Sequence, residues 1–487
     1  MTTSPQTQPL PSPGRARRRQ LHLRGRQHQQ WRARTSDLLE LMAAGLLVAT
    51  VSVFLRDGGG QHLVTGTWGS RLIAVGQLTG LVAVDLLLVQ MLLAARVPWV
   101  DRVYGSDRAL KAHRVLGRVT VPLVLVHAES LVLGYAARDG MPWWSGWLRE
   151  PFAMLSGVPD MLTATIALFL LVLIAVTSVR AAMRRVGYER WHLVHLGAYA
   201  AVALAIPHQL SVGSDITSSG LVRFVWLGLY VLVAASIIWW RFAVPVFRSA
   251  RHRLYVERVV QETPDTWSVH VAGRDLRALE ARAGQFFQWR FLTRGLWAAA
   301  HPWSLSAQPD GRSLRLTVRE LGDHSSLLAD LRPGTRVLVE GPYGAFTTRR
   351  RTRRKVLLLA AGIGVTPIRA LAEELARDPA TAPGDVTVIY RADHASQLAL
   401  RDELDAVSRH GGHRLHLLTG PPVRGSWLPE HVGRGDDDAS ALAELVPHLR
   451  EHDVYLCGPP VWMDLVHTSL RRARVPRAHI HDERFSW

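Results

Sequence analysis

Six apolar stretches in the first half of the chain constrain its fold more than any other feature. A bilayer core about 30 Å thick needs roughly 20 apolar residues in a helix that crosses it, and most of these stretches approach that length. They predict an all-α bundle of six transmembrane helices within residues 37–250. The expected spans are residues 38–55, 71–95, 112–135, 161–180, 191–212 and 221–246.

Basic residues gather at the borders of these stretches and give the bundle an orientation. The net charge of +18 would also suit nucleic-acid binding. However, the loops at 96–114 and 180–190 are rich in Lys and Arg, as is the exit of the last span, whereas the alternate loops are not. The positive-inside rule then predicts a multi-pass protein of the cell membrane with both termini in the cytoplasm. We expect contact with lipid and no nucleic-acid partner.

The N-terminal charge and the cysteine content set further limits. Residues 1–36 hold eight arginines and no acidic residue, which predicts a disordered basic cytoplasmic tail. Cys457 is the only cysteine, so internal disulfides, a structural zinc cluster and a four-thiolate iron–sulfur centre are excluded. No Cys-x-x-Cys-His sequence is present, so a c-type haem is excluded too.

Five histidines lie on the third and fifth predicted spans or at their ends. A single membrane histidine is more often a packed hydrogen-bonding residue than a ligand, but the spacing here is regular. On the third span, His113 and His127 are 14 residues apart, and on the fifth span, His195 and His208 are 13 residues apart. These separations correspond to about 21 and 19.5 Å of helix. Because these spans run parallel, the pattern predicts two stacked bis-imidazole haem sites. The inner site would use His113 and His195, and the outer site His127 and His208.

Alternatives remain for the ligands of the fifth span. On an ideal helix, 13 residues turn His208 about 140° away from the direction of His195. Pro207 offers a kink that could re-aim the ring of His208. His192 is an alternative to His195 as the inner ligand.

Two arginines lie within about a turn and a half of His113 and could pair with haem propionates. For Arg114, a border charge that reaches out of the membrane is an equal alternative. Arg118 lies deeper, which favours a buried anion partner.

After residue 252 the composition becomes that of a soluble protein. Residues 253–346 contain short alternating segments separated by Gly and Pro turns, and they predict an antiparallel β-barrel. Residues 353–487 alternate apolar strands with helical stretches and predict an α/β domain. The expected strand segments include 313–319 and 336–340 in the barrel, and 356–360, 386–390 and 454–457 in the α/β domain. The basic run 349–355 is expected to form a solvated or membrane-facing edge.

The strongest local motif is an apolar strand that runs into a glycine turn. Gly362 and Gly364 would let the backbone approach a diphosphate, and a following helix N-terminus would favour its negative charge. Thr366 is expected to cap that helix, with Pro367 in its first turn. The motif predicts a dinucleotide site. Arg391, at the end of the next strand, could meet a 2′-phosphate or simply lie in solvent.

Several short motifs gain meaning from their order along the chain. The sequence His301-Pro-Trp-Ser-Leu-Ser306 follows Gly284-Gln-Phe286 and precedes Gly322-Asp-His-Ser-Ser326 and Gly341-Pro-Tyr-Gly344. After six spans with paired histidines, this order resembles the ferric reductase and NADPH oxidase superfamily. Its soluble module has the ferredoxin reductase fold, and the resemblance covers residues 40–487.

The resemblance assigns FAD to the barrel and a nicotinamide nucleotide to the α/β domain. It implies that His301 contacts the FAD diphosphate, Ser304 the flavin ring, and Trp303 the flavin or ribose. Soluble ferredoxin reductases carry Arg where this chain has His301, whereas the membrane oxidases carry His. The residues implied to bind FAD are His301, Pro302, Trp303, Ser304, Arg319 and Ser325, the last two at phosphate.

The same resemblance gives catalytic places to C-terminal residues. Cys457, followed by Gly458, matches a Cys-Gly-Pro beside the nicotinamide, although a small buried thiol is the alternative. Glu483 and Phe485 match a C-terminal Glu-x-Phe. Trp487 stands where an aromatic residue commonly covers the flavin face that the nicotinamide must occupy, which could sharpen a preference for NADPH over NADH.

The implied function is electron transfer from cytoplasmic NADPH or NADH, through FAD and two b-type haems, to an acceptor at the outer face. Ferric chelates, dioxygen and quinone are the candidate acceptors. Dioxygen-reducing relatives place a histidine where this chain has Leu131, which favours ferric iron. Two alternatives are a haem relay that serves a quinone or a periplasmic partner, and a non-enzymatic membrane anchor or ion pathway with structural histidines.

Overall fold

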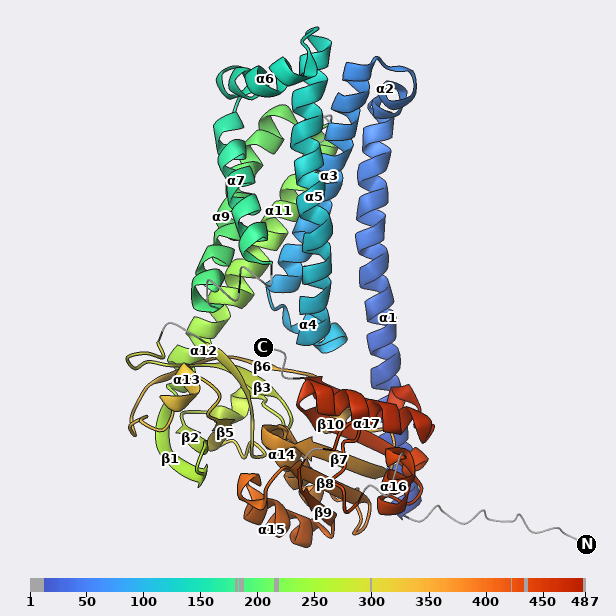
Figure 1. Cartoon of the computed structure of the whole chain (residues 1–487), viewed down its shortest axis with the longest axis vertical. Helices are drawn as coiled ribbons and strands as arrows, with labels where there is room; N and C mark the ends of the chain where they lie inside the picture. Colours follow the sequence, from blue (N-terminus) through green and yellow to red (C-terminus); the bar gives the residue numbers. More distant parts are fainter. Residues whose placement is uncertain are drawn as a thin grey trace, which may run out of the picture. The chain divides into compact units, whose positions relative to one another are not determined.

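The computed structural model describes residues 13–179, 183, 188–213, 219–297, 300–421, 423–432 and 437–484. The chain divides into two compact units. One is helical and comprises residues 35–100 and 107–242, while the other contains the chain from residue 243 onward together with two short earlier segments. Each unit is described by itself (Figure 1).

The helical unit contains the predicted apolar helices. Five helices of the described chain are long and apolar enough to cross a membrane. They are α1 (Pro13–Arg56), α3 (Trp68–Ala94), α5 (Ser106–Arg138), α9 (Tyr188–Val212) and α11 (Gly220–Ile237), the last continuing through η1 (Ile238–Ala243) and α12 (Val244–His252). The remaining predicted span is the shorter α7 (Met161–Thr177). The chain is therefore a multi-pass membrane protein.

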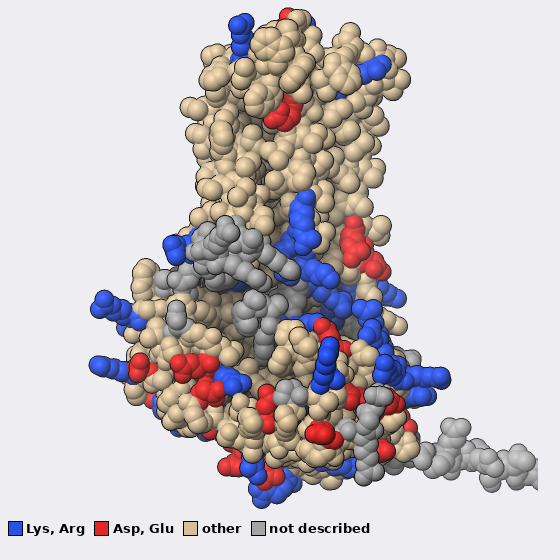
Figure 2. Space-filling model, viewed as in Figure 1, with Lys and Arg blue, Asp and Glu red and all other residues tan. Residues whose placement is uncertain are grey.

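The surface of this unit is largely apolar, as contact with lipid requires. Figure 2 shows a long surface over the helices with few charged side chains. Three further helices were not predicted, namely α2 (Gly59–Thr65), α4 (Pro98–Tyr104) and α6 (Trp143–Gly157). Helix α6 exposes Trp143, Trp144 and Trp147, which suits an aromatic belt at a membrane interface.

The expected disorder of the N-terminal tail is wrong for residues 13–36, because α1 already begins at Pro13. Arg, Gln and Leu are good helix formers, and proline is tolerated at the first helical position. An existing apolar helix also extends without the cost of a new nucleus. Residues 1–12 lie outside the described residues.

The first part of the other unit is the predicted antiparallel barrel. It contains two three-stranded sheets, in the orders β1-β2-β5 and β4-β3-β6. Single bridges from Tyr255 to Arg336 and from Leu305 to Leu316 join strands of the two sheets. The strands are β1 (Tyr255–Thr263), β2 (Thr266–Ala272), β3 (Phe286–Phe291), β4 (His301–Ser304), β5 (Ser313–Arg319) and β6 (Val337–Tyr343). The side chains of Phe287, Trp289 and Phe291 lie in the barrel core.

The second part is the predicted α/β domain. Its five strands are parallel, in the order β11-β10-β7-β8-β9. They are β7 (Lys355–Ala361), β8 (Val386–Ala392), β9 (Arg414–Thr419), β10 (His452–Gly458) and β11 (Ile480–Arg484). The principal helices are α14 (Val365–Arg377), α15 (Arg401–Gly411), α16 (Asp438–Leu445) and α17 (Pro460–Arg472). The predicted fold class is confirmed.

The basic run between the barrel and the α/β domain is anchored, and the expectation of a solvated edge is wrong for its centre. Arg351 is buried and donates to Thr381 and to the Arg354 carbonyl. The backbone N–H groups of Thr352 and Arg353 donate to the buried carboxylate of Asp453, at 2.5 and 2.6 Å. These contacts fix the start of β7 on β10.

Candidate flavin, nucleotide and haem sites

The strand order of the α/β domain defines where a ligand can bind. From β7 the chain proceeds outward through β8 and β9, and it then returns to the other side of β7 through β10 and β11. In open α/β sheets, ligands bind beyond the carboxyl ends of the strands at such a switch point. Here β7 ends at the turn Gly362–Gly364, and β10 ends at Gly458.

The two glycines of this turn have different roles. Gly362 has φ +52°, and a Cβ atom there would meet nothing within 4 Å. A Cβ atom on Gly364 would lie 2.3 Å from the Cys457 carbonyl oxygen and 2.8 Å from the Cα of Gly458. Gly362 therefore borders open space in which a ligand could approach the protein backbone. Gly364 instead packs on the end of β10.

The predicted helix cap is wrong by two residues. Helix α14 begins at Val365, with Gly364 as its N-cap residue. Thr366 is buried, and its hydroxyl donates to the Ile363 carbonyl at 3.0 Å. A short 3-10 turn over 362–364 moves the helix start forward, so Thr366 and Pro367 lie inside the first turn. The N-terminus of α14 still follows the glycine turn directly, as the dinucleotide motif requires.

Cys457 lies in the hydrophobic core instead of in an open site. Its side chain is fully buried among apolar residues that include Val365 and Tyr455. Burial raises the pKa of the Cys457 thiol well above its usual value. This burial agrees with the alternative of a packed thiol. Glu483 is its neighbour on β11, whereas Phe485 and Trp487 lie outside the described residues.

The flavin motif forms strand β4, which pairs with β3. His301 stacks on Trp303 with ring centres 4.9 Å apart, and His324 packs edge-on against His301 at the same separation. Trp303 is held through its carbonyl, which accepts from the indole N–H of Trp289 at 2.9 Å. Burial lowers the pKa of His301 to about 4, so its ring is neutral at neutral pH. His324 is a site neighbour that the sequence motif did not single out.

Two polar atoms of this strand fit a bound cofactor. The Nε2 atom of His301 and the Oγ atom of Ser304 are buried and have no hydrogen-bond partner among the described residues. Unpaired buried polar groups are costly and rare in proteins. A flavin nucleotide, which carries both donors and acceptors, would satisfy them, so the residues present fit the FAD that the resemblance implies.

Three predicted phosphate contacts already have partners in the protein. Arg319 donates to the carboxylate of Asp265 at 2.7 Å. The Ser325 hydroxyl accepts from the backbone N–H groups of Leu321 and Gly322. Arg391 is buried and donates to the carbonyls of Ala392 and Pro421. The solvent-exposed alternative for Arg391 is wrong, and each of the three side chains has at least one partner within the protein.

Two buried arginines and the partly exposed Glu403 form a charged network that joins the barrel to the α/β domain, and sequence reasoning missed it. Arg315 on β5 donates to the Ser306 hydroxyl at 3.0 Å and to Glu403 on α15 at 2.7 Å. Arg369 on α14 contacts the same Glu403 at 3.0 Å and also pairs with Glu373. Ser306 follows the flavin strand by two residues, and Arg369 follows the glycine turn by five. The network therefore fixes the two motifs relative to each other.

Glu403→Gln is expected to weaken this interface by about 1–3 kcal/mol, because two arginines lose their shared anion. The urea midpoint for release of the flavin, followed by the change in its fluorescence, should fall. Although burial opposes it, the hydrogen bond and charge of Arg315 lower the pKa of Glu403. Its contribution is therefore present above the ordinary carboxyl pKa of about 4.3 and is lost as the pH falls through the lowered folded-state pKa.

The matched control is Asp405→Asn on the same helix, since Asp405 pairs with Arg409 in solvent. Exposed pairs contribute about 0.2–1 kcal/mol, so this variant should unfold nearly as the wild type does. Equal midpoints for both variants would show that Glu403 does not join the domains.

In the helical unit, both histidines of α5 are oriented by main-chain carbonyls of α3. The Nδ1 atom of His113 lies 3.1 Å from the Gln90 oxygen, and that of His127 lies 2.7 Å from the Gly76 oxygen. A carbonyl only accepts, so Nδ1 carries the proton and Nε2 keeps a lone pair in the neutral ring. Metal-binding histidines are typically held in this way.

The inner pair is brought together as predicted. The ring centres of His113 and His195 are 6.0 Å apart, and with metal–nitrogen bonds of about 2 Å, two rings on one metal would be separated by roughly this distance. The Nδ1 atom of His195 is buried without a partner among the described residues. His195 also stacks on Trp191 at 5.1 Å. This contact with His113 favours His195 over His192.

The outer pair consists of His127 on α5 and His208 on α9. His208 is close enough to His127 for electrostatic interaction, and α9 runs through Pro207 without ending. The Nδ1 atom of His208 is buried without a partner in the described part of the chain. A Cβ atom on Gly80 would lie 2.5 Å from Nδ1 of His127, so this glycine makes room for the ring.

The exposure of the two arginines near His113 differs from the expectation for one of them. Arg114 and Arg118 are both exposed on α5. The expected burial of Arg118 is therefore wrong. Both remain able to reach an anion at the surface of the bundle, and Arg114 agrees with a border charge that reaches outward.

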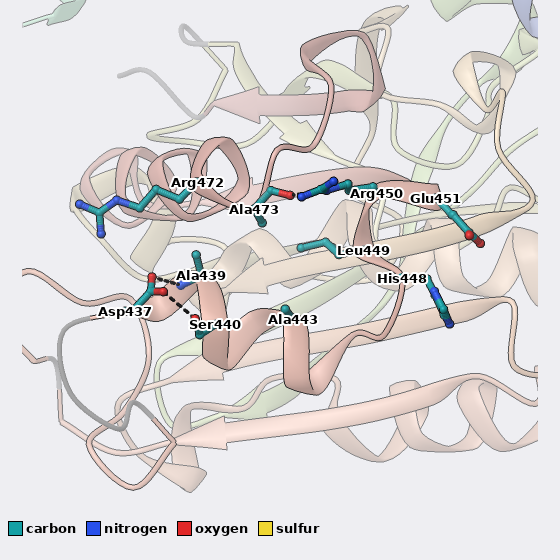
Figure 3. Close-up of a pocket in the computed structure, with 10 residues that line it drawn as sticks. All are labelled: Asp437, Ala439, Ser440, Ala443, His448, Leu449, Arg450, Glu451, Arg472 and Ala473. Atoms are coloured by element: carbon teal, nitrogen blue, oxygen red, sulfur yellow. Dashed lines mark hydrogen bonds between the residues drawn. The ribbon is translucent and has the colours of Figure 1, made fainter.

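A surface pocket lies away from all of these residues. Figure 3 shows it between α16, the turn at 449–451 and the end of α17. Its volume is about 700 Å³. Its lining includes Asp437, Arg450 and Arg472. No residue of the predicted sites lines it, and we assign it no function.

Comparison with known proteins agrees with this division. The family described as "Ferric reductase like transmembrane component" matches residues 79–206, and "Oxidoreductase NAD-binding domain" matches residues 358–468. Ferredoxin–NADP reductase B of Sorangium cellulosum is 30% identical over 194 residues, which cover 38% of this chain and 77% of that protein.

Other relatives match over part of their length. The ferredoxin reductase component of 3-ketosteroid-9-alpha-monooxygenase from Rhodococcus rhodochrous is 30% identical over 239 residues, 48% of this chain and 64% of that protein. A flavohemoprotein of Rhizobium meliloti is 28% identical over 38% of this chain and 47% of its own length. The chain thus spans about half to two-thirds of these two relatives. A solved FAD/NAD-binding domain of a Vibrio cholerae nitric oxide dioxygenase is 24% identical and covers 48% of this chain and 99% of that domain, with a TM-score of 0.40.

Fold, motifs and comparisons together define a membrane oxidoreductase with a flavin- and nucleotide-binding reductase module. The chain joins a transmembrane domain that matches the ferric-reductase-like family to a ferredoxin-reductase-type module, which is the fusion that its sequence resembles.

Proposed function

We propose that this protein transfers electrons from cytoplasmic NADPH, with NADH as the alternative donor, through FAD and two b-type haems to an acceptor at the outer face. The observation that carries the proposal is the pair His113 and His195, with ring centres 6.0 Å apart and with His113 oriented by the Gln90 carbonyl. A non-enzymatic anchor would not need such an arrangement, which suits a shared metal.

Each group of residues has a defined task in this proposal. The turn at Gly362 and the N-terminus of α14 bind the nucleotide diphosphate. His301 and Ser304 bind and orient the flavin through their unpaired atoms, and the network at Glu403 keeps the two motifs in register. The histidine pairs hold the haems. When bound, the flavin and haems supply the conversion of a two-electron donor into single electrons.

Ferric iron is our proposed acceptor. Leu131 stands where dioxygen-reducing relatives carry a histidine, and its apolar side chain supplies no proton donor or acceptor there. Dioxygen, quinone and a periplasmic partner are the alternatives. Both termini are proposed to be cytoplasmic on the basis of the charge of the loops. Trp487 is proposed to cover the flavin face at which the nicotinamide reacts.

Anaerobic reduction of the purified protein by NADPH tests this function. We expect flavin bleaching and reduced-haem bands, followed by reoxidation when a ferric chelate is added. Dioxygen and a quinone, each added to a separate reduced sample, serve as the comparison acceptors. A wild-type protein without haem in a pyridine haemochrome assay would refute the proposal. Reoxidation by quinone alone would refute the choice of acceptor.

A further inference from the structure

One acidic residue lies in the interior of the helical unit without an assigned role. Asp85 on α3 is 3% exposed, and neither carboxylate oxygen has a hydrogen-bond partner at ordinary distance among the described residues. The helix around it is apolar and long enough to span a membrane. Ionisable residues inside a membrane are costly to retain and usually mark pathways for ions, protons or substrates.

Asp85 lies at a depth between the two histidine levels. The α3 carbonyls that hold His127 and His113 belong to Gly76 and Gln90. Asp85 follows Gly76 by nine residues and precedes Gln90 by five, which is about 13 and 8 Å along the helix. A charge on either metal would therefore be felt at this carboxyl, since charges are weakly screened in an apolar interior.

The side chain leaves α3 on the face away from α5. At 100° per residue, Asp85 is turned about 180° from Gly76 and about 140° from Gln90. The hydroxyl of Thr50 on α1 lies close enough to interact with it. The titratable group near it among the described residues is the Tyr230 hydroxyl on α11, which is within electrostatic range and donates to Gln209, the neighbour of His208 on α9.

We propose that Asp85 is a proton-binding site coupled to the charge on the haems, an inference that rests on the proposed function. When one electron is held between α5 and α9, one proton from water joins the Asp85 carboxylate to form the neutral acid. When that electron leaves for the acceptor, the proton is released. The proton thus balances the charge of the electron in the membrane interior.

Redox titration of the holoprotein in detergent, followed by haem absorbance at several pH values, tests the coupling. In the wild type, the midpoint potential of at least one haem should fall as the pH rises, by up to about 59 mV for each tenfold change in proton concentration. Asp85→Asn keeps the shape of the side chain but exchanges no proton, so its slope should be markedly smaller. Asp85→Glu keeps an exchangeable carboxyl and should retain the slope. It is the second variant to titrate if Asp85→Asn does not fold.

The matched control is Asp139→Asn, because the Asp139 side chain is 49% exposed at the end of α5 and pairs with Arg138. Its slope should equal that of the wild type. Equal slopes for wild type and Asp85→Asn, with both haems present, would overturn the Asp85 proposal while leaving the proposed function intact. Absence of haem from the wild type would overturn both.

A second readout does not depend on the potential. Dicyclohexylcarbodiimide modifies protonated carboxyls in apolar surroundings, and peptide mass spectrometry locates the modification. We expect Asp85 to be labelled more strongly in the dithionite-reduced than in the oxidised protein, and Asp139 to be labelled equally in both. Equal labelling of Asp85 in the two states would contradict coupling to the haems.

Discussion

Replacing His127 or His208 with alanine is expected to remove the outer haem and to leave an inner haem that NADPH still reduces. Each variant deletes one of the two proposed ligands of the outer haem. In the His127 variant, the Gly76 carbonyl also loses the imidazole that it orients. His113→Ala or His195→Ala should instead stop electron transfer to any outer haem that remains. Haem content per chain and NADPH-reducible haem are the two measurements.

His192→Ala is the matched control, since His192 lies one turn before His195 on α9. It should keep both haems, because the structure brings His195 and not His192 to a ring distance of 6.0 Å from His113. If His192→Ala loses a haem and His195→Ala keeps both, the inner ligand has been assigned to the wrong residue.

The second large effect is expected at the glycine turn, where the two glycines should fail in different ways. Gly364→Val forces side-chain atoms against the Cys457 carbonyl, already 2.3 Å from a Cβ atom, and overpacking of this kind costs about 1–3 kcal/mol or more. It should lower the melting temperature of the α/β domain together with nucleotide-driven reduction. Gly362→Ala should raise the KM for NADPH by about tenfold, equivalent to about 1.4 kcal/mol, while flavin and dithionite-reducible haem remain normal.

The strain of Gly362→Ala needs its own control, because φ is +52° there. Gly334→Ala in the barrel introduces a side chain at φ +87°, also with nothing within 4 Å. Both changes should cost about 1–2 kcal/mol of backbone strain, but only the first should alter the kinetics with NADPH. Identical KM values in steady-state assays would show that the space beside Gly362 does not receive the nucleotide.

The sequence was sufficient for the layout of the fold because its strongest signals are local. Apolar spans near bilayer length and short alternating strands identify their own structure without knowledge of distant partners. The glycine turn was likewise predicted, since β7 and α14 flank it in the chain. The helical tail was missed because its basic composition, typical of disorder, concealed residues that readily extend α1.

The site was harder to predict because partners distant in sequence decide what each side chain can do. Arg319 pairs with Asp265, 54 positions away, and Arg391 donates to the Pro421 carbonyl, 30 positions away. Cys457 has the expected motif, but its side chain points into a core formed by α14. The alternation of β5 alone would place Arg315 on the solvent face, but the side chain is buried because its partner Glu403 lies on another domain.

The hydrogen bonds that orient His113 and His127 come from the backbone of α3, and this affects how the protein can evolve. A main-chain carbonyl is present whatever residue occupies its position, so substitutions at Gln90 would leave the acceptor in place. The hydrogen bonds that orient both rings therefore depend on the course and register of α3, and not on the side chains at positions 76 and 90. Related chains could differ at Gln90 and still present the same acceptor to His113, whereas Gly80 has to stay small because a Cβ atom there would lie 2.5 Å from Nδ1 of His127. Comparison of their sequences would therefore show the glycine but not the main-chain contact that orients His113.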